Sequence, residues 1–303
     1  MPHACWVEGG IVSVPPASYR MGLVTGGFLT ALAVLAAAAL PRDSRDTRSL
    51  GSQVSPGTDD LAMVQTVLAE ARGASLLMCE MAAGTIRGNF WWRNREPVDE
   101  DVRNMLQWVR RDPSDVAVVP VLVAAMSDMD PCVARTGARL LGRMEHERAT
   151  EGLLVALRDT SAQVREMAAL GLGVAEPEAA IEPLIEVLSG DPGPRVRVMA
   201  AWALGELENP EAIESLSRAL TDGPPPLRRA AASALGEIEH ADAVPALVRA
   251  LNDPDSVVRT QAAWALGEIE DHAAVDALSR ALLSDVASDV RVAAARALGA
   301  IEE

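Results

Sequence analysis

The sequence predicts an all-α protein, a right-handed α-solenoid of about six two-helix repeats with a divergent helical N-terminal cap, preceded by one hydrophobic helix. The first observation is a repeated motif: AAWALGELE at 200–208, AASALGEIE at 231–239 and AAWALGEIE at 262–270. The second is composition, because 49% of the residues are hydrophobic but only 3% are aromatic. An apolar set made mostly of Ala, Leu and Val suits close helix–helix contact better than strands, which favour β-branched and aromatic residues.

A glycine marks the register of the repeat. It recurs every 31 or 32 residues, at Gly142, Gly173, Gly205, Gly236, Gly267 and Gly299. Self-similarity at a fixed period of this length is the signature of a repeat architecture. Because glycine costs about 1 kcal/mol relative to alanine inside a helix, its return in every unit predicts a close approach of backbones at this position.

Each unit is predicted to contain two short helices. The first carries apolar residues at helical spacing, as at Val244, Leu247 and Leu251. A turn follows, in which Asp and Pro residues such as those of NDPDS and GDPGP favour a chain reversal. The second helix is rich in alanine, as in VVRTQAAWALGEIE, which allows neighbouring helices to approach closely.

An aspartate and an arginine recur in phase with the glycine. The aspartate lies fourteen residues before the glycine in all six units, and the arginine lies eight residues before it in five units. The first unit has Ala134 at the arginine position. In the other units the residues are Asp159, Arg165, Asp191, Arg197, Asp222, Arg228, Asp253, Arg259, Asp285 and Arg291.

The frame D-x5-R-x7-G, the two-helix unit and the pattern VRxxAAxALGEI resemble HEAT repeats, of the short bacterial kind found in phycobilisome lyases. The resemblance covers about 113–303, nearly two-thirds of the chain. It implies that the aspartates and arginines form a ladder of hydrogen bonds along the stack. Their role is then structural rather than catalytic, and the rung at Ala134 is missing from the pattern.

The chain before the repeats is predicted to have three parts. Residues 1–20 show no apolar period and are expected to be a flexible leader, and residues 41–58 form a Ser/Gly/Pro-rich linker. Between them, MGLVTGGFLTALAVLAAAAL at 21–40 holds no charge and has the length of a membrane-crossing helix, about 20 residues. We expect a membrane anchor here, or export if this segment is a cleaved signal. The side of the membrane and the true start, Met1 or Met21, stay open.

Residues 59–112 are helical in pattern but out of phase with the repeats. Thr58 is expected to cap a first helix, because acidic residues follow it directly. Terminal repeats are usually atypical, since one of their faces has no neighbour. We therefore interpret this segment as a divergent cap, and 113–303 as the repeat solenoid.

The tryptophans of the repeated motif indicate a binding surface. Trp202 and Trp264 lie three residues before the register glycine, where a side chain is expected to face outward on the second helix. In HEAT-like stacks the second helices line the concave face, and Trp and Arg are enriched at binding hot spots. The predicted partner contacts, at this position and four residues earlier, are Arg139, Leu170, Val198, Trp202, Arg229, Trp264 and Arg296. The opposing interpretation, that each Trp packs half-buried over alanine-rich neighbours, stays open.

No pattern in the sequence indicates an active site, a metal or a cofactor. The sequence contains no G-x-S-x-G, HExxH or P-loop motif, and no lysine. Three cysteines stand at unrelated spacings and form no metal-ligand pair, so Cys79 and Cys132 are expected to be buried thiols. The histidines that follow second helices fall in separate loops, too far apart for one metal ion: His146, His240 and His272.

These observations favour a binding protein over an enzyme. The formal net charge of −16 disfavours nucleic acids and anionic lipid surfaces as partners. We therefore expect a non-catalytic, monomeric scaffold that binds a protein or peptide along its concave face. The alternative, implied by the resemblance to bilin lyases, is a lyase-like or other protein-modifying enzyme or accessory factor. The sequence identifies neither the partner nor the pathway.

Overall fold

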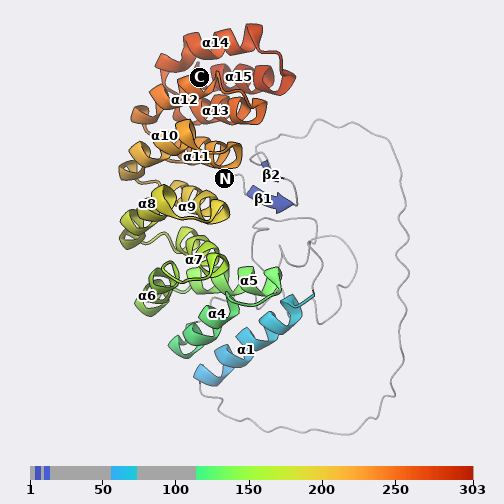
Figure 1. Cartoon of the computed structure of the whole chain (residues 1–303), viewed down its shortest axis with the longest axis vertical. Coiled ribbons are helices and arrows are strands. Elements are labelled where there is room, and N and C mark those ends of the chain that lie inside the picture. The colour runs from blue at the N-terminus through green and yellow to red at the C-terminus, as the bar shows by residue number, and fades with distance from the viewer. Residues whose placement is uncertain (1–3, 8–9, 14–55, 74–113, 303) are drawn as a thin grey trace, which may run out of the picture. The chain divides into compact units, whose positions relative to one another are not determined.

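The computed structural model describes residues 4–7, 10–13, 56–73 and 114–302 (Figure 1). The chain divides into two compact units, Met1–Val54 and Ser55–Glu303. In the first unit, β1 (Ala4–Val7) and β2 (Gly10–Ser13) pair as antiparallel strands, with Val7 opposite Gly10. These strands lie within 1–20, the segment for which the sequence predicted a flexible leader. ACWV and GIVS contain residues of high β-propensity, but strands this short show no measurable period.

The second unit contains six two-helix repeats between residues 116 and 302, as the register glycines predict (Figure 1). In each repeat the second helix carries the register glycine. The repeats are α4 (Val119–Ala125) with α5 (Pro131–Gly142), α6 (Glu147–Ala156) with α7 (Ala162–Ala175), α8 (Ile181–Gly190) with α9 (Pro194–Glu206), α10 (Ile213–Asp222) with α11 (Pro225–Glu237), α12 (Val244–Ala250) with α13 (Ser256–Ile269), and α14 (Val275–Ser284) with α15 (Ser288–Ile301).

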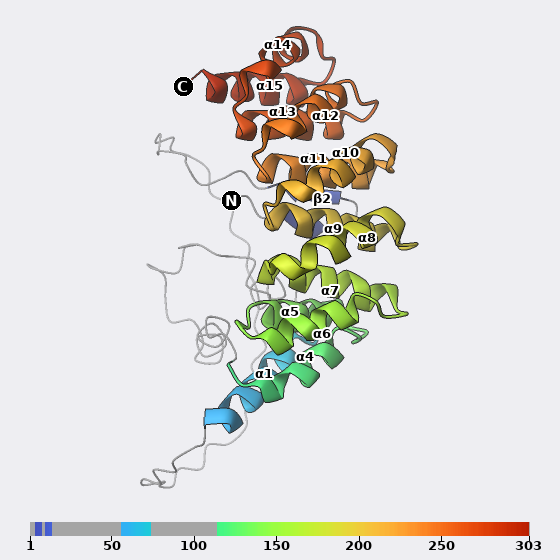
Figure 2. The same ribbon diagram turned by 90° about the vertical axis from the view of Figure 1, so that its left-hand side faces the viewer.

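The repeats stack in chain order, with the first helices in one layer and the second helices in another (Figures 1 and 2). In the second-helix layer each helix contacts the next, from α5 through α7, α9, α11 and α13 to α15. The core lies between the layers. Each first helix contributes a leucine with no exposed surface: Leu122, Leu153, Leu184, Leu216, Leu247 and Leu278. Burial of one such side chain stabilises the fold by about 1.5–3 kcal/mol, so the repeated leucine accounts for much of the cohesion between layers.

The register glycines explain the close packing of the second helices. A Cβ atom added to Gly205, Gly236 or Gly267 would lie within 3.0 Å of both the Cα and the Cβ of an alanine on the next second helix. The alanines are Ala234, Ala265 and Ala297, respectively. Any side chain at the glycine would push the two helices apart, which confirms the close backbone approach expected from the sequence. Gly299, on the last helix, has nothing within 4 Å of its Cβ position among the described residues.

The cap begins with α1 (Pro56–Ala71), which packs against α5. This helix starts before Thr58, so Thr58 is not its N-cap, in contrast to the prediction. Asp60 is buried, and its Oδ2 accepts hydrogen bonds from the backbone and side chain of Ser114 at 2.8 and 3.0 Å. At the other end of α1, Arg72 forms an ion pair with Asp128 of the first repeat. The rest of the predicted cap, 74–112, lies outside the described residues.

The predicted membrane attachment needs correction. Among the residues that the structure describes, no helix combines the length and the apolar character needed to cross a bilayer. The segment at 21–40, on which the prediction depended, lies outside those residues. A membrane-anchored or exported location is therefore unsupported and takes no part in the function proposed below.

Candidate binding face

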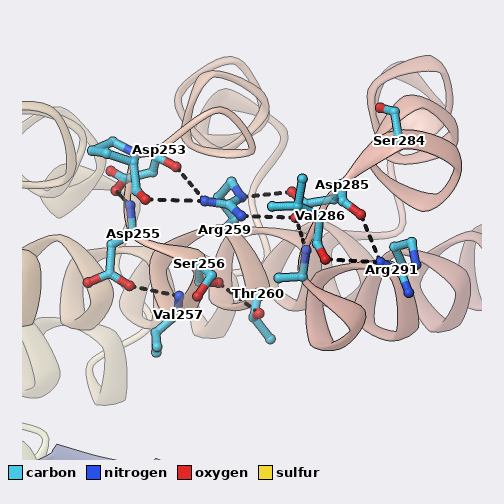
Figure 3. Close-up of polar contacts among 12 residues, drawn as sticks. Asp253, Asp255, Ser256, Val257, Arg259, Thr260, Ser284, Asp285, Val286 and Arg291 are labelled. Carbon is cyan, nitrogen blue, oxygen red and sulfur yellow. Dashed lines mark hydrogen bonds and ion pairs between the residues drawn. The ribbon is translucent and has the colours of Figure 1, made fainter.

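The N-terminal edge of the second helices carries the Asp–Arg pairs (Figure 3). Arg259, on α13, connects two turns. Its Nε and Nη2 donate hydrogen bonds to the two carboxylate oxygens of Asp285 at 2.7 and 2.9 Å, and its Nη1 donates to the main-chain carbonyl of Asp253 at 2.9 Å. Asp285 belongs to the next repeat. A bidentate arginine–carboxylate pair fixes geometry as well as adding energy, so Arg259 ties two successive repeats together.

The same bidentate bond occurs at two further junctions. Arg228 donates to Asp253 at 2.7 and 2.8 Å, and Arg165 donates to Asp191 at 2.6 and 3.0 Å. Each carboxylate also accepts a hydrogen bond from the backbone N–H two residues later, as Asp191 does from Gly193 at 2.7 Å. Burial acts to raise the pKa of Asp191, but the bonds from Arg165 and Gly193 outweigh it and hold that pKa below its usual range.

The pair expected between Arg197 and Asp222 is absent. The Nε of Arg197 instead donates to the carbonyl oxygen of Leu188, in its own repeat, at 2.9 Å. Asp222 is exposed and makes no ion pair among the described residues. A match to the D-x5-R-x7-G pattern is therefore not sufficient by itself to form an Asp–Arg pair between repeats.

The Asp–Arg ladder is also incomplete at both of its ends. Asp159 has no arginine opposite it, because Ala134 stands at that position, and its Oδ1 accepts only from local groups, Ser161 N–H at 2.7 Å and the Thr160 hydroxyl at 3.5 Å. Arg291 donates to the carbonyl oxygen of Asp285 at 2.8 Å, and no described aspartate follows it along the stack (Figure 3).

Trp202 and Trp264 lie at equivalent positions on α9 and α13, separated by α11, and both are half-buried. The ring of Trp202 packs over α7, with its Cζ3 only 2.6 Å from the position that a Cβ on Gly173 would occupy. Ser233 holds the equivalent position on α11 and is also half-buried. Each tryptophan thus combines contacts within the stack with an accessible part of its surface.

Two of the predicted partner contacts need correction. Leu170 and Val198 are each only 3% exposed, so they are core residues that a partner cannot reach. The glycine–alanine contacts bring neighbouring second helices so close that an aliphatic side chain at these positions is covered. Arg139 and Arg229 are half-buried, and Arg296 on the last helix is exposed.

Arg229 lies on α11, one helical turn before Ser233. Its Nε is buried and has no hydrogen-bond partner among the described residues. Burial lowers the pKa of the Arg229 guanidinium, and the charge of Asp255 acts in the opposite direction. A partly desolvated cation is therefore available between the two tryptophans, on the side toward the N-termini of the second helices.

The C-terminal edge of the second helices carries glutamates that were not among the predicted contacts. Glu206, Glu237 and Glu268 each follow a register glycine directly, and none makes an ion pair among the described residues. Burial, together with the charges of Glu237 and Glu176, raises the pKa of Glu206 to about 7. Burial and neighbouring glutamates also raise the pKa values of Glu237 and Glu268.

Three residues after the register glycine, four of the repeats carry a glutamate with an unusual backbone conformation. Glu176, Glu208, Glu239 and Glu270 have φ of 51, 49, 49 and 55°, in the left-handed region. Glycine or asparagine normally occupies such a position at the end of a helix. The sequence contained the signal for this acidic edge, the recurring GEIE, but nothing in it indicates the backbone angle.

His146, His240 and Cys132 have structural rather than ligating surroundings. His146 and His240 cap helices, their Nδ1 atoms accepting from the backbone N–H of Arg148 and Asp242 at 3.0 and 3.2 Å. Cys132 is buried, as expected, but it is disulfide-bonded rather than a free thiol, and Cys79 lies outside the described residues. Within the described ranges, no group of three or more His, Cys, Asp or Glu side chains has the geometry to hold a metal ion.

Comparison with known proteins agrees with this architecture. The family of HEAT repeats matches residues 150–233 and 216–299. No curated protein sequence matches the chain.

Several solved structures are similar. A Kap121p mutant aligns with a TM-score of 0.53 at 13% identity, over 80% of this chain and 29% of that one. The complex of CpcE and CpcF of phycocyanin lyase from Nostoc aligns with a TM-score of 0.37 at 23% identity, over 60% of this chain and 99% of that one. A designed armadillo repeat protein in complex with the peptide (KR)4 gives 0.43 at 20% identity, over 60% and 99%.

At these identities the solved structures concern the fold alone. The family match covers the stacked two-helix units, and it includes the three junctions where arginine and aspartate form bidentate pairs. The chain is therefore a HEAT-repeat protein.

Proposed function

We propose that this protein is a non-catalytic scaffold whose second-helix face binds a segment of another protein or a peptide, with Trp202 and Trp264 as anchors. The observation that carries the proposal is the placement of the two half-buried rings at equivalent positions two repeats apart, with the small Ser233 between them. Tryptophan side chains that are partly packed and partly accessible are typical of binding hot spots. Adjacent packed helices lie about 8–10 Å apart, so the rings stand about two helix spacings apart and can each hold a different side chain of one partner segment.

The charges around the tryptophans constrain the chemistry of the partner. On one side of the face, the half-buried Arg229 adds a cation that makes no ion pair among the described residues, which favours a partner carboxylate. On the other side, the edge formed by Glu206, Glu237 and Glu268 disfavours any polyanion. A polypeptide segment that carries both charge signs fits this face, whereas a nucleic acid does not.

An enzyme of the lyase-like or protein-modifying kind is the alternative. No arrangement of side chains on this face favours it over binding, and a fold shared with other proteins does not supply a site. The experiment below distinguishes this enzyme from a binding protein by its turnover.

The test is affinity capture with the full chain, followed by titration of the captured protein or peptide against purified variants. Replacement of both Trp202 and Trp264 by Ala should weaken binding by at least about 2 kcal/mol, or about 30-fold, while the melting temperature changes little. The matched control is Leu266→Ala, since Leu266 has no exposed surface and its truncation should cost about 2–5 kcal/mol of stability.

Two results would contradict the proposal. Unchanged affinity of the double variant would remove the tryptophans from the interface. A loss of stability as large as that of Leu266→Ala would make them packing residues, as the opposing interpretation of the sequence holds. Turnover of a small substrate, or covalent change of the captured protein, would favour the enzyme.

A further inference from the structure

The junction between the α8–α9 repeat and the α10–α11 repeat differs from the others in the described part of the chain. Every other junction is crossed by a polar side-chain bond on the N-terminal edge of the second helices: Gln163 to the carbonyls of Met126 and Asp128, Arg165 to Asp191, Arg228 to Asp253, and Arg259 to Asp285. Across the α8–α9 and α10–α11 junction, no side-chain hydrogen bond or ion pair joins residues 178–208 to residues 209–239.

Local sequence explains the missing bond. In the other turns, the aspartate is held by the backbone N–H two residues later, as Asp253 is by Asp255 and Asp285 is by Ala287, both at 2.8 Å. The residue two after Asp222 is Pro224, which has no N–H to donate. Asp222 remains the last residue of α10 instead of leaving the helix in an extended conformation, as Asp285 does. Its carboxylate is therefore not directed to Arg197.

The closest backbone contact at this junction lies near the C-terminal end of α9. Gly205 packs on Ala234, where a Cβ on the glycine would lie 2.8 Å from the alanine Cα. Arg197 lies eight residues before Gly205, which corresponds to about 12 Å along α9. The two helices are thus closest near the C-terminal end of α9, whereas at the edge that other junctions clamp, apolar packing joins the two repeats without a polar bond, as the buried Val198 and Leu227 show.

We propose that the solenoid bends at this junction, as two clamped blocks that pivot about the contact between Gly205 and Ala234. One block ends with α9 and holds Trp202, and the other begins with α10 and holds Trp264. Bending therefore changes the separation of the two rings, which lets the face accept partner segments of different thickness. The bend follows from the missing clamp and does not depend on the proposed binding.

The test measures the spread of distances across the junction in the full chain. Spin labels carried by an unnatural amino acid are placed at Glu186 and Arg249, on α8 and α12, so that the pair spans the proposed pivot. The control pair, Arg218 and Arg280 on α10 and α14, spans two clamped junctions. All four side chains are exposed and occupy equivalent positions on first helices. The distance distribution should be broader for the first pair, and equal widths would overturn the proposal.

Two variants sharpen the result. The graft Gly223→Pro, Pro224→Asp, Pro225→Ser copies the turn at 254–256 and restores an N–H for Asp222, so it should narrow the first distribution to the width of the control. Arg228→Ala removes a clamp and should broaden the control pair. A graft that folds and restores the hydrogen bond between Arg197 and Asp222 but leaves the first distribution broad would contradict the proposed cause.

Discussion

The two edges of the second helices carry carboxylates in opposite electrostatic situations. At the N-terminal edge, Asp191, Asp253 and Asp285 accept bidentate hydrogen bonds from arginines, and their pKa values are lowered. At the C-terminal edge, Glu206, Glu237 and Glu268 are partly desolvated beside other glutamates, and their pKa values are raised. The turns before the second helices thus hold stabilising carboxylates, and the C-terminal ends of these helices hold destabilising ones.

The clamped aspartates hold neighbouring repeats together, whereas the glutamates of the C-terminal edge lower the stability of the stack. A clamped aspartate contributes to the cohesion of neighbouring repeats, whereas a row of half-buried like charges opposes it. Residues that oppose stability are often those that serve another purpose, such as the choice of a partner.

The largest effect is expected at the clamped edge. Arg228→Ala leaves the carboxylate of Asp253, whose side chain is 8% exposed, without its charged partner. Removal of one member of a buried pair should lower the free energy of unfolding by about 3 kcal/mol. Chemical denaturation of the wild type and the variant measures this difference.

The matched control is Arg218→Ala, because Arg218 pairs with Glu214 on the surface of α10 and both side chains are more than two-thirds exposed. That change should cost no more than about 0.5 kcal/mol. Equal losses in the two variants would mean that the bidentate geometry at the clamped edge adds nothing beyond a surface ion pair.

A smaller effect, on pH dependence, is expected at the acidic edge. The folded-state pKa of Glu206, about 7, lies above its ordinary value of 4.5. Between these values the folded protein binds more protons than the unfolded chain, so the free energy of unfolding should fall as pH rises from about 4.5 to 7. One pKa unit corresponds to about 1.4 kcal/mol, and with allowance for solvent screening we expect a loss of about 2 kcal/mol by pH 8.

The clamped aspartates act in the opposite direction. Their pKa values are lowered, so their contribution is complete above the unfolded pKa of about 3.9 and is lost as pH falls through the folded values. Stability should therefore be greatest near pH 5. Glu206→Gln should flatten the decline between pH 5 and 8 and leave the acid limb unchanged, which urea denaturation across this range will measure. An unaltered decline in the variant would assign it to other groups.

The periodic features of the fold were predictable from the sequence, because each repeat presents the same residues to its neighbours. The spacing of Gly205, Gly236 and Gly267 predicted the two-helix units and the close backbone contacts, and both are present. Burial of Leu170 and Val198 was not predictable, since it depends on how closely adjacent second helices pack. An outward position in the repeat pattern does not by itself leave a side chain accessible.

Departures from the repeat were harder to predict, although the sequence contains a signal for one of them. Asp222 and Arg197 match the frame, yet the pair fails because of Pro224, which stands two residues after the aspartate. The stretch TDGPPP predicts this failure once it is known that the aspartate must accept a hydrogen bond from the backbone N–H two residues later. The sequence does not predict the left-handed backbone of the glutamates, because the path of the chain into the next repeat, and not the preference of the residue, sets this conformation.

The smallest effect is expected from those glutamates. Glu239 has φ 49°, and an L-residue in this region costs about 1 kcal/mol relative to glycine, so Glu239→Gly should raise the free energy of unfolding by up to about 1 kcal/mol. The substitution also removes a charge beside Glu237. Glu239→Gln keeps the backbone cost and removes only the charge, so the difference between the two variants isolates the conformational part. Because that part does not titrate, it should be the same at pH 5 and pH 8, whereas the gain from Glu239→Gln should shrink as the pH falls, because the pKa values of the neighbouring Glu237 and Glu268 are raised and both lose their charge on acidification. Equal gains for the two variants at both pH values would show that repulsion at the acidic edge, and not the left-handed backbone, sets the cost of this position.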